Sequence, residues 1–105
     1  MNIKIHTKGI DLTDDEQAYA EEKAGKILHM SKRAETDESV QVKIEIDKET
    51  GKAKDSQFSA SFTVILPGKT LRGEASGTGV LKVIESGYEK VRKQMRKETT
   101  THKHV

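Results

Sequence analysis

Several residue types that often reveal a protein's class are absent or scarce in this chain of 105 residues. It contains no cysteine, no tryptophan, one proline and only four aromatic residues, two tyrosines and two phenylalanines. The absence of cysteine excludes disulfide bonds and thiolate chemistry. Four aromatic side chains are too few for a platform on which single-stranded bases could stack.

Long apolar segments are absent as well. The first ten residues, MNIKIHTKGI, lack the apolar stretch of a secretory signal. No apolar run approaches the length that spans a membrane. We therefore expect a soluble, cytoplasmic protein without a membrane partner.

The apolar residues that are present follow regular patterns. They make up 32% of the chain, and the mean hydropathy is −0.74. Both values are low, but the periodic grouping of the apolar residues argues against disorder. The length suits one domain with a modest core. We predict a single folded domain over residues 1–98 and a flexible tail over residues 99–105, where three threonines disfavour a helix.

Charged residues make up 34% of the chain with a net charge of +2, so the total says little about partners. Their distribution is more informative. Six acidic residues and no basic one lie between Asp11 and Glu22, whereas seven basic and three acidic residues lie between Lys82 and Lys103. This asymmetry predicts positive potential at one end of the fold.

The spacing of apolar residues predicts four strands and two helices. Strands are indicated by alternation, and helices by apolar residues three and four apart. Thr13 and Glu16 have the spacing of a capping box at a helix start. In chain order we expect a strand at 2–6, a helix at 13–30, strands at 40–46, 58–66 and 71–75, and a helix at 78–97. Residues 48–56 are expected to form a long, exposed hairpin loop.

Each predicted strand has one apolar and one polar face, which suits a sheet covered by helices on one side. The fold class is therefore α+β: a two-layer sandwich of order β-α-β-β-β-α, with a four-stranded sheet and both helices on one face. Gly25 and two alanines should let the first helix lie close to the sheet. The expected core positions are Gln17, Ala20, Ala24, Ile27 and Leu28 on the first helix and Val80, Ile84, Tyr88, Val91 and Met95 on the last.

Nothing in the sequence indicates an enzyme. The four histidines lie near no convincing nucleophile, and His102 with His104 supplies two metal ligands where a specific site needs more. The Gly77-Thr78-Gly79 segment is too short for a phosphate-binding loop. We expect no catalytic residues, no metal, no cofactor and no small-molecule substrate.

Basic residues gather on both predicted helices. If the helices pack side by side, their exposed surfaces form one cationic plateau that suits a phosphate backbone. Without a stacking platform, a folded RNA read by its shape fits this surface better than a single strand. The alternative is that lysines at helix ends complement the helix dipole and keep the surface soluble. The basic residues concerned are Lys23, Lys26, Lys32 and Arg33 near the first helix end, and Lys90, Arg92, Lys93, Arg96 and Lys97 in the last helix.

The ordered set of segments resembles the short ribosome hibernation-promoting factors, or ribosome-associated translation inhibitors, also known as sigma-factor modulation proteins. The similarity extends from Asn2 to about Lys97. It rests on the helix start Leu12-Thr13-Asp14-Asp15, on Lys23, Lys26 and Ile27, on the small-residue strand with Leu71, Gly73 and Ala75, and on Lys90, Val91, Lys93, Gln94, Met95 and Lys97.

This resemblance implies a fold similar to double-stranded RNA-binding domains and a role in translation. Such proteins bind in the decoding region of the small ribosomal subunit and occlude the tRNA and mRNA channel. By match, Lys23, Lys26, Lys90, Lys93 and Lys97 would contact ribosomal RNA phosphates; Arg92 and Arg96 join them by position. The protein is expected to be a monomer off the ribosome.

The sequence departs from the family pattern in three places. Met30-Ser31 replaces an aromatic pair at the end of the first helix, and Thr78-Gly79 replaces an acidic cap before the last one. The sequence also ends at Val105 without the linker and second domain of long-form relatives, so we expect no pairing of ribosomes through such a domain. The alternative function is a protein-interaction module that regulates another factor, such as a transcription factor, without binding RNA.

Overall fold

The computed structural model describes residues 3–30, 40–48 and 57–103. The elements are β1 (Ile3–Lys8), α1 (Asp14–His29), β2 (Gln41–Lys48), β3 (Phe58–Leu66), β4 (Lys69–Gly77) and α3 (Val80–Lys103). This order confirms the predicted β-α-β-β-β-α arrangement. The loop predicted at 48–56 starts with the last residue of β2 and otherwise lies outside the described residues, as do Lys32 and Arg33.

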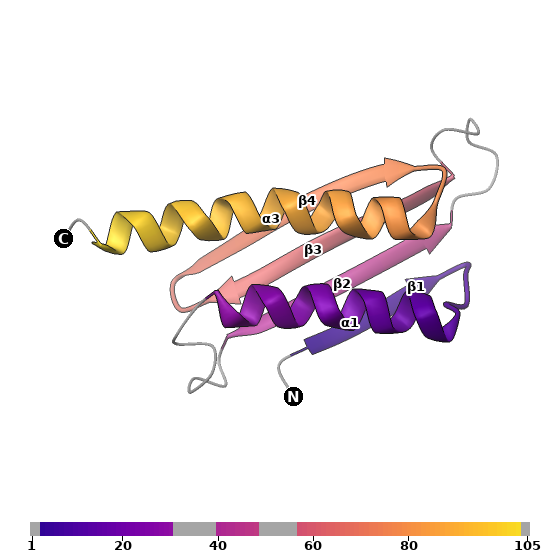
Figure 1. Ribbon diagram of the computed structural model, residues 1–105, viewed down its shortest axis with the longest axis horizontal. Coiled ribbons are helices and arrows are strands. Elements are labelled where there is room, and N and C mark those ends of the chain that lie inside the picture. The colour runs from indigo at the N-terminus through magenta and orange to yellow at the C-terminus, as the bar shows by residue number, and fades with distance from the viewer. Residues whose placement is uncertain (1–2, 31–39, 49–56, 104–105) are drawn as a thin grey trace.

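The four strands form one mixed sheet in the order β1-β2-β3-β4. β1 pairs with β2 in parallel, so α1 is the crossover connection that parallel neighbours need. The pairs β2–β3 and β3–β4 are antiparallel. Both helices lie on the same face of the sheet, as predicted, with α1 packed on β1 and β2 and α3 on β3 and β4 (Figure 1).

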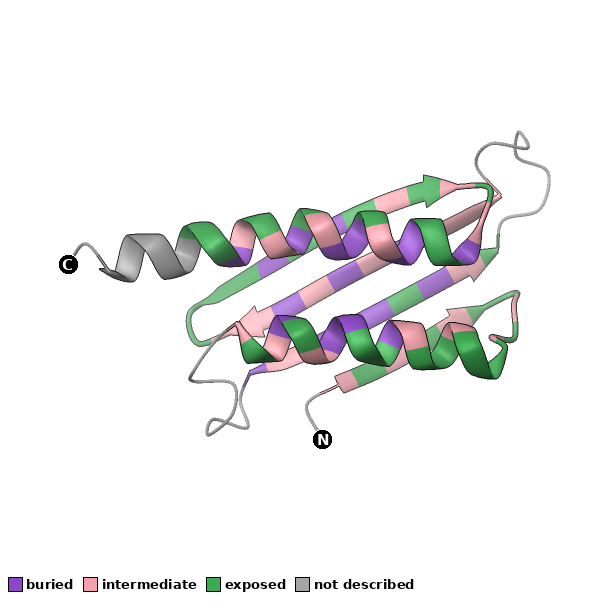
Figure 2. Ribbon diagram, in the orientation of Figure 1, coloured by how far each residue is buried: buried purple, intermediate pink, exposed green. Residues whose placement is uncertain are grey.

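The strand register aligns the apolar residues beneath the helices. Ile44 on β2 lies beside Phe62 on β3, which lies beside Gly73 on β4. Ile44 and Phe62 are fully buried, and the five apolar residues predicted for the last helix are all buried as well. Figure 2 shows buried residues recurring along both helices and along the strands that the helices cover. The core therefore occupies the single space between the two layers.

Two glycines bring α3 close to the sheet. A Cβ atom on Gly87 would lie 2.9 Å from Phe62 Cδ1, and one on Gly73 would lie 2.9 Å from the Gly87 carbonyl oxygen. The prediction that Gly25 lets the first helix approach the sheet is wrong, because a Cβ on Gly25 would meet no atom within 4 Å. The glycines that permit a close approach to the sheet lie at the contact with α3.

The start of α1 follows the prediction, and its buried face differs slightly. The Thr13 hydroxyl accepts from the Glu16 backbone N–H, and Glu16 accepts from the Thr13 N–H, which confirms the capping box. Gln17, expected in the core, is exposed and donates to Glu21. The buried stripe of α1 is rotated toward α3, so that it includes Lys23 and leaves out Gln17.

The last helix is longer than predicted. It continues to Lys103, whereas the sequence pattern ended it at about Lys97. Threonine lowers helix propensity by only about 0.7 kcal/mol relative to alanine, which a growing helix tolerates. Most of the expected tail at 99–105 therefore has helical backbone, and residues 104–105 lie outside the described part. No helix in the described part of the chain is long and apolar enough to cross a membrane.

Candidate nucleic-acid interface

The two helices lie side by side and run in the same direction (Figure 1). Their carboxyl-terminal halves therefore face the same end of the molecule, which is where the sequence concentrates its basic residues. The negative ends of both helix dipoles meet there too, so cations at this end are favourable whether or not a ligand binds. This shared end is the candidate interface.

Four of the seven predicted contact residues lie exposed on this surface. Lys93, Arg96 and Lys97 are exposed on α3, and Lys26 is exposed on α1. Lys26 Nζ lies 3.7 Å from Glu22 Oε1, one helical turn away, in a pair that water screens on both sides. We call Lys26, Lys93, Arg96 and Lys97 the cationic helical surface.

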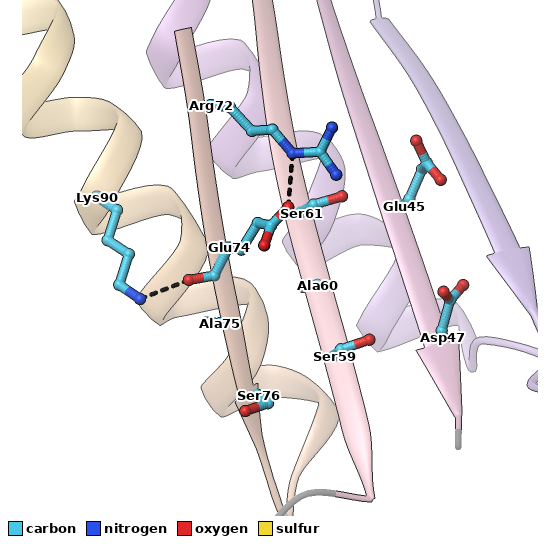
Figure 3. Close-up of a pocket in the computed structure, with 10 residues that line it drawn as sticks. All are labelled: Glu45, Asp47, Ser59, Ala60, Ser61, Arg72, Glu74, Ala75, Ser76 and Lys90. Carbon is cyan, nitrogen blue, oxygen red and sulfur yellow. Dashed lines mark hydrogen bonds and ion pairs between the residues drawn. The ribbon is translucent and has the colours of Figure 1, made fainter. Parts of the chain in front are cut away.

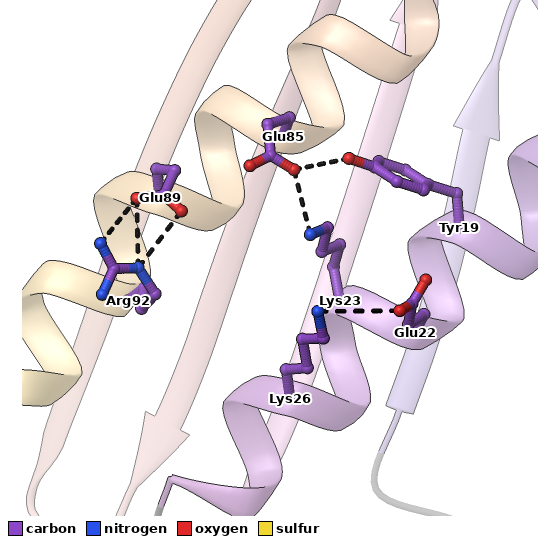
Figure 4. A network of polar contacts seen from close by, with 7 residues as sticks. All are labelled: Tyr19, Glu22, Lys23, Lys26, Glu85, Glu89 and Arg92. Atoms are coloured by element: carbon purple, nitrogen blue, oxygen red, sulfur yellow. Dashed lines mark hydrogen bonds and ion pairs between the residues drawn. The ribbon is translucent and has the colours of Figure 1, made fainter.

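Lys23 is not on that surface, and its expected exposure is wrong. The residue is 9% exposed and lies in the seam between the helices (Figure 4). Its Nζ is 3.1 Å from Glu85 Oε2 on α3, and it lies 5.1 Å from the centre of the Tyr19 ring and 4.6 Å from that of Tyr88. The Tyr19 hydroxyl donates to the same Glu85 oxygen at 2.5 Å. Lys23 thus joins α1 to α3.

The charges of this cluster stabilise one another. The hydrogen bond from Tyr19, followed by that from Lys23, lowers the pKa of Glu85. Burial works against the charged form of Lys23, but the hydrogen bond to Glu85 and the nearby charges outweigh it and leave the Lys23 pKa raised. The hydrogen bond to Glu85 and burial raise the pKa of Tyr19. At neutral pH the cluster holds a charged lysine, a charged glutamate and a neutral tyrosine.

Arg92 is also engaged within the protein. It lies one turn from Glu89 on α3 and donates to both carboxylate oxygens, at 2.8 to 3.2 Å. This bidentate pair lowers the pKa of Glu89 and raises that of Arg92. The seam is consequently mixed in charge, with glutamates between the cations (Figure 4).

Lys90 points away from α1, toward the edge of the sheet. Its Nζ donates to the backbone carbonyl of Glu74 on β4, and Gln94 Nε2 donates to the carbonyl of Arg72 at 2.7 Å. The two side chains cover carbonyl groups of an edge strand that could otherwise pair with another chain. Lys90 would have to leave this contact to bind a phosphate.

The cationic helical surface can attract and position a polyanion. Its charges supply affinity that depends on salt, and lysines give little base selectivity when they contact phosphates. Among the described residues, no group of three or more histidine, aspartate and glutamate residues could hold a metal.

Sequence reasoning missed the role of Glu85. The available signal was weak: Tyr19 and Lys23 stand four residues apart on the flank of one helix, and Glu85 and Tyr88 stand three apart on the other. Only the three-dimensional pairing of the helices shows that these flanks meet.

The comparisons with known proteins give one family model that matches the chain and two solved structures of similar fold. The family model described as sigma 54 modulation protein / S30EA ribosomal protein matches residues 3–103. The N-terminal domain of Thermus thermophilus Protein Y has 22% identity and a TM-score of 0.70, over 92% of this chain and 98% of that one. A ribosomal subunit interface protein from Coxiella burnetii has 18% identity and a TM-score of 0.71, over 95% and 99%. No curated protein matches the sequence closely.

Proposed function

The chain belongs to the sigma 54 modulation protein / S30EA ribosomal protein family, and on that premise we propose that it binds the small ribosomal subunit and inhibits translation. The proposed mechanism is steric: the bound protein occludes the channel that tRNA and mRNA use. The structural relatives described as Protein Y and as a ribosomal subunit interface protein support this assignment, since both share the fold across nearly the whole chain.

The observation that carries the proposal is the common direction of α1 and α3. It brings Lys26 on one helix and Lys93, Arg96 and Lys97 on the other to the same end of the molecule. These exposed cations would contact ribosomal RNA phosphates, and the shape of the binding groove would supply selectivity. The interhelix cluster around Glu85 keeps the two helices at a fixed separation, so the cations form one surface.

Two further predicted contacts contribute less binding free energy in this proposal. Lys90 and Arg92 already have partners in the fold, the Glu74 carbonyl and the Glu89 carboxylate. Each would exchange an internal contact for a phosphate, so the net gain is smaller than for Lys93. Lys23 acts on the surface indirectly, by holding α1 against α3.

Sedimentation with purified small subunits at increasing salt tests this function. The logarithm of the binding constant should fall linearly with that of the salt concentration, with a slope of about −0.9 for each neutralised phosphate. The double variant Lys93→Glu, Lys97→Glu should bind much more weakly and with a shallower slope. Lys82→Glu, also exposed on α3 but near its start, is the matched control and should resemble the unmodified protein.

Two results would overturn the proposal. One is co-sedimentation that does not respond to salt. The other is equal binding of the double variant and the unmodified protein, with both folded. An accompanying cell-free translation assay should show inhibition by the unmodified protein and by Lys82→Glu, and much less by the double variant.

The family description favours one second candidate, regulation of a transcription factor through protein contacts, since it includes sigma 54 modulation. A pull-down from nuclease-treated extract distinguishes the two functions. Recovery of a protein partner without ribosomal RNA supports the second candidate, and loss of all partners on nuclease treatment supports the first.

A further inference from the structure

The face of the sheet opposite the helices has its charges ordered in rows. The register places Lys4 on β1 beside Lys43 on β2, Lys43 beside Thr63 on β3, and Thr63 beside Arg72 on β4. We call these four residues the basic row. The next row along the strands consists of His6, Glu45, Ser61 and Glu74. The row thus crosses all four strands, with cations on β1, β2 and β4 and a threonine on β3, and carboxylates lie on one side of it.

The basic row contains a like-charge pair that the fold does not neutralise. Lys4 and Lys43 are register partners on strands about 4.8 Å apart, and like charges in that position repel each other. Neither forms a hydrogen bond or ion pair with any residue that the structure describes. The other cation on this face of β1 differs, because Lys8 lies beside Asp47. An external anion at the basic row would remove the repulsion.

Arg72 extends the row toward the opposite edge of the sheet. Its Nε donates to Glu74 Oε1 at 2.7 Å, and its guanidinium group reaches over β3 (Figure 3). The side chain is 57% exposed, and a guanidinium has further N–H groups beyond Nε that can bind a phosphate. A shallow depression of about 480 Å³ lies beside it, on the side of the acidic row. Its lining includes Glu45, Asp47 and Glu74, so an anion is favoured over the basic row and not in this depression.

We propose that the basic row is a second anion-binding surface that takes the phosphate backbone of an RNA segment. This inference rests on the proposed function, in which the cationic helical surface binds ribosomal RNA on the other side of the molecule. The protein is then held between two RNA segments, one on the helices and one on the open sheet face. Glu45 and Glu74 in the adjacent row repel a backbone that strays from the basic row, so the RNA crosses the strands. The row spans three strand spacings, about 14 Å, enough for more than one phosphate.

The test is small-subunit sedimentation with the double variant Lys4→Gln, Lys43→Gln, measured against salt. Its salt slope should be shallower by about 1.8, because two cations no longer displace counterions. Lys8→Gln, on the same strand and the same face, is the matched control and should leave the slope unchanged. Glu45→Gln, which removes a neighbouring negative charge, should bind more tightly than the unmodified protein. Thermal melts verify that each variant is folded.

An unchanged slope in the Lys4, Lys43 variant overturns the inference, as does a slope change of equal size in Lys8→Gln. If the Lys4, Lys43 double variant binds normally while the Lys93→Glu, Lys97→Glu variant does not, the proposed function stands and the second surface is wrong. If neither double variant alters binding, the proposed function and the second surface are both wrong. If the basic row retains a partner after nuclease treatment, its ligand is an acidic protein, and the inference is wrong.

Discussion

Replacing Lys23 by methionine should destabilise the fold by about 2 kcal/mol. Methionine keeps an apolar chain in the seam between the helices but removes the ammonium group. The substitution therefore deletes the ion pair with Glu85 and the approach to the Tyr19 and Tyr88 rings. It retains most of the packing of the lysine stem.

The magnitude follows from the geometry of these contacts. A hydrogen bond to a charged group contributes about 1.5–3 kcal/mol, and a cation over an aromatic face about 0.5–1 kcal/mol where water has access. Glu85 is 42% exposed and keeps its hydrogen bond from Tyr19, so water and that hydroxyl compensate part of the loss. A discounted total of about 2 kcal/mol lowers the melting temperature by roughly 10 °C for a domain of this size.

Thermal and urea denaturation of Lys23→Met and Lys26→Met measure this effect. Lys26 belongs to the same helix, but its side chain is 51% exposed and its partner Glu22 lies 3.7 Å away. Its replacement should change stability by less than about 0.5 kcal/mol. The reasoning is refuted if the two variants are equally stable. It is also refuted if Lys23→Met makes the salt slope of subunit binding shallower by about 0.9, because Lys23 would then be a phosphate contact.

Four further predictions concern stability. Gly87→Ala should cost about 1–3 kcal/mol in chemical denaturation, because the new Cβ would lie 2.9 Å from Phe62. Gly25→Ala, where that atom meets open space, should stabilise by up to about 1 kcal/mol, and a loss at that position would contradict the packing described. Thr13→Ala removes the cap of α1 and should cost about 1 kcal/mol, whereas Thr13→Ser should be near neutral. Because Tyr19 and Lys23 lower the folded-state pKa of Glu85, its contribution is present above pH ~4.3 and is lost as the pH falls. The acid-side loss of stability should therefore be smaller in Glu85→Gln than in the unmodified protein, and an identical loss would show that Glu85 contributes none of it.

The strands and the core stripe of α3 were predictable because their periods are strong and local. Alternation along Phe58–Leu66 fixes which side chains face the helices, and the spacing of Val80, Ile84 and Met95 permits only one buried helical face. The capping box was predictable for the same reason, since Thr13 and Glu16 interact over three residues.

The position of individual cations was not predictable, because it depends on partners far away in the sequence. Lys23 is buried only because Glu85, on the other helix, lies beside it. Lys90 is engaged because β4 lies beside its side of α3, where the Glu74 carbonyl accepts its hydrogen bond. The pairing of Lys4 with Lys43 required the parallel register of β1 and β2. A charge count along a helix does not contain this information.

The end of α3 was misjudged for a different reason. Threonine propensities argued for fraying after Lys97, but propensity is a weak determinant once a helix is nucleated. Val91 and Met95 are buried and anchor the preceding turns of α3, and the helix continues from them to Lys103.

Hydroxyl-radical footprinting of small-subunit RNA tests the central claim most directly. With the unmodified protein bound, we expect protected nucleotides to line the tRNA and mRNA channel, and the protection to disappear with Lys93→Glu, Lys97→Glu but to persist with Lys82→Glu. Bound protein that leaves the RNA of this channel unprotected, or protection that is the same for all three proteins, would contradict the account.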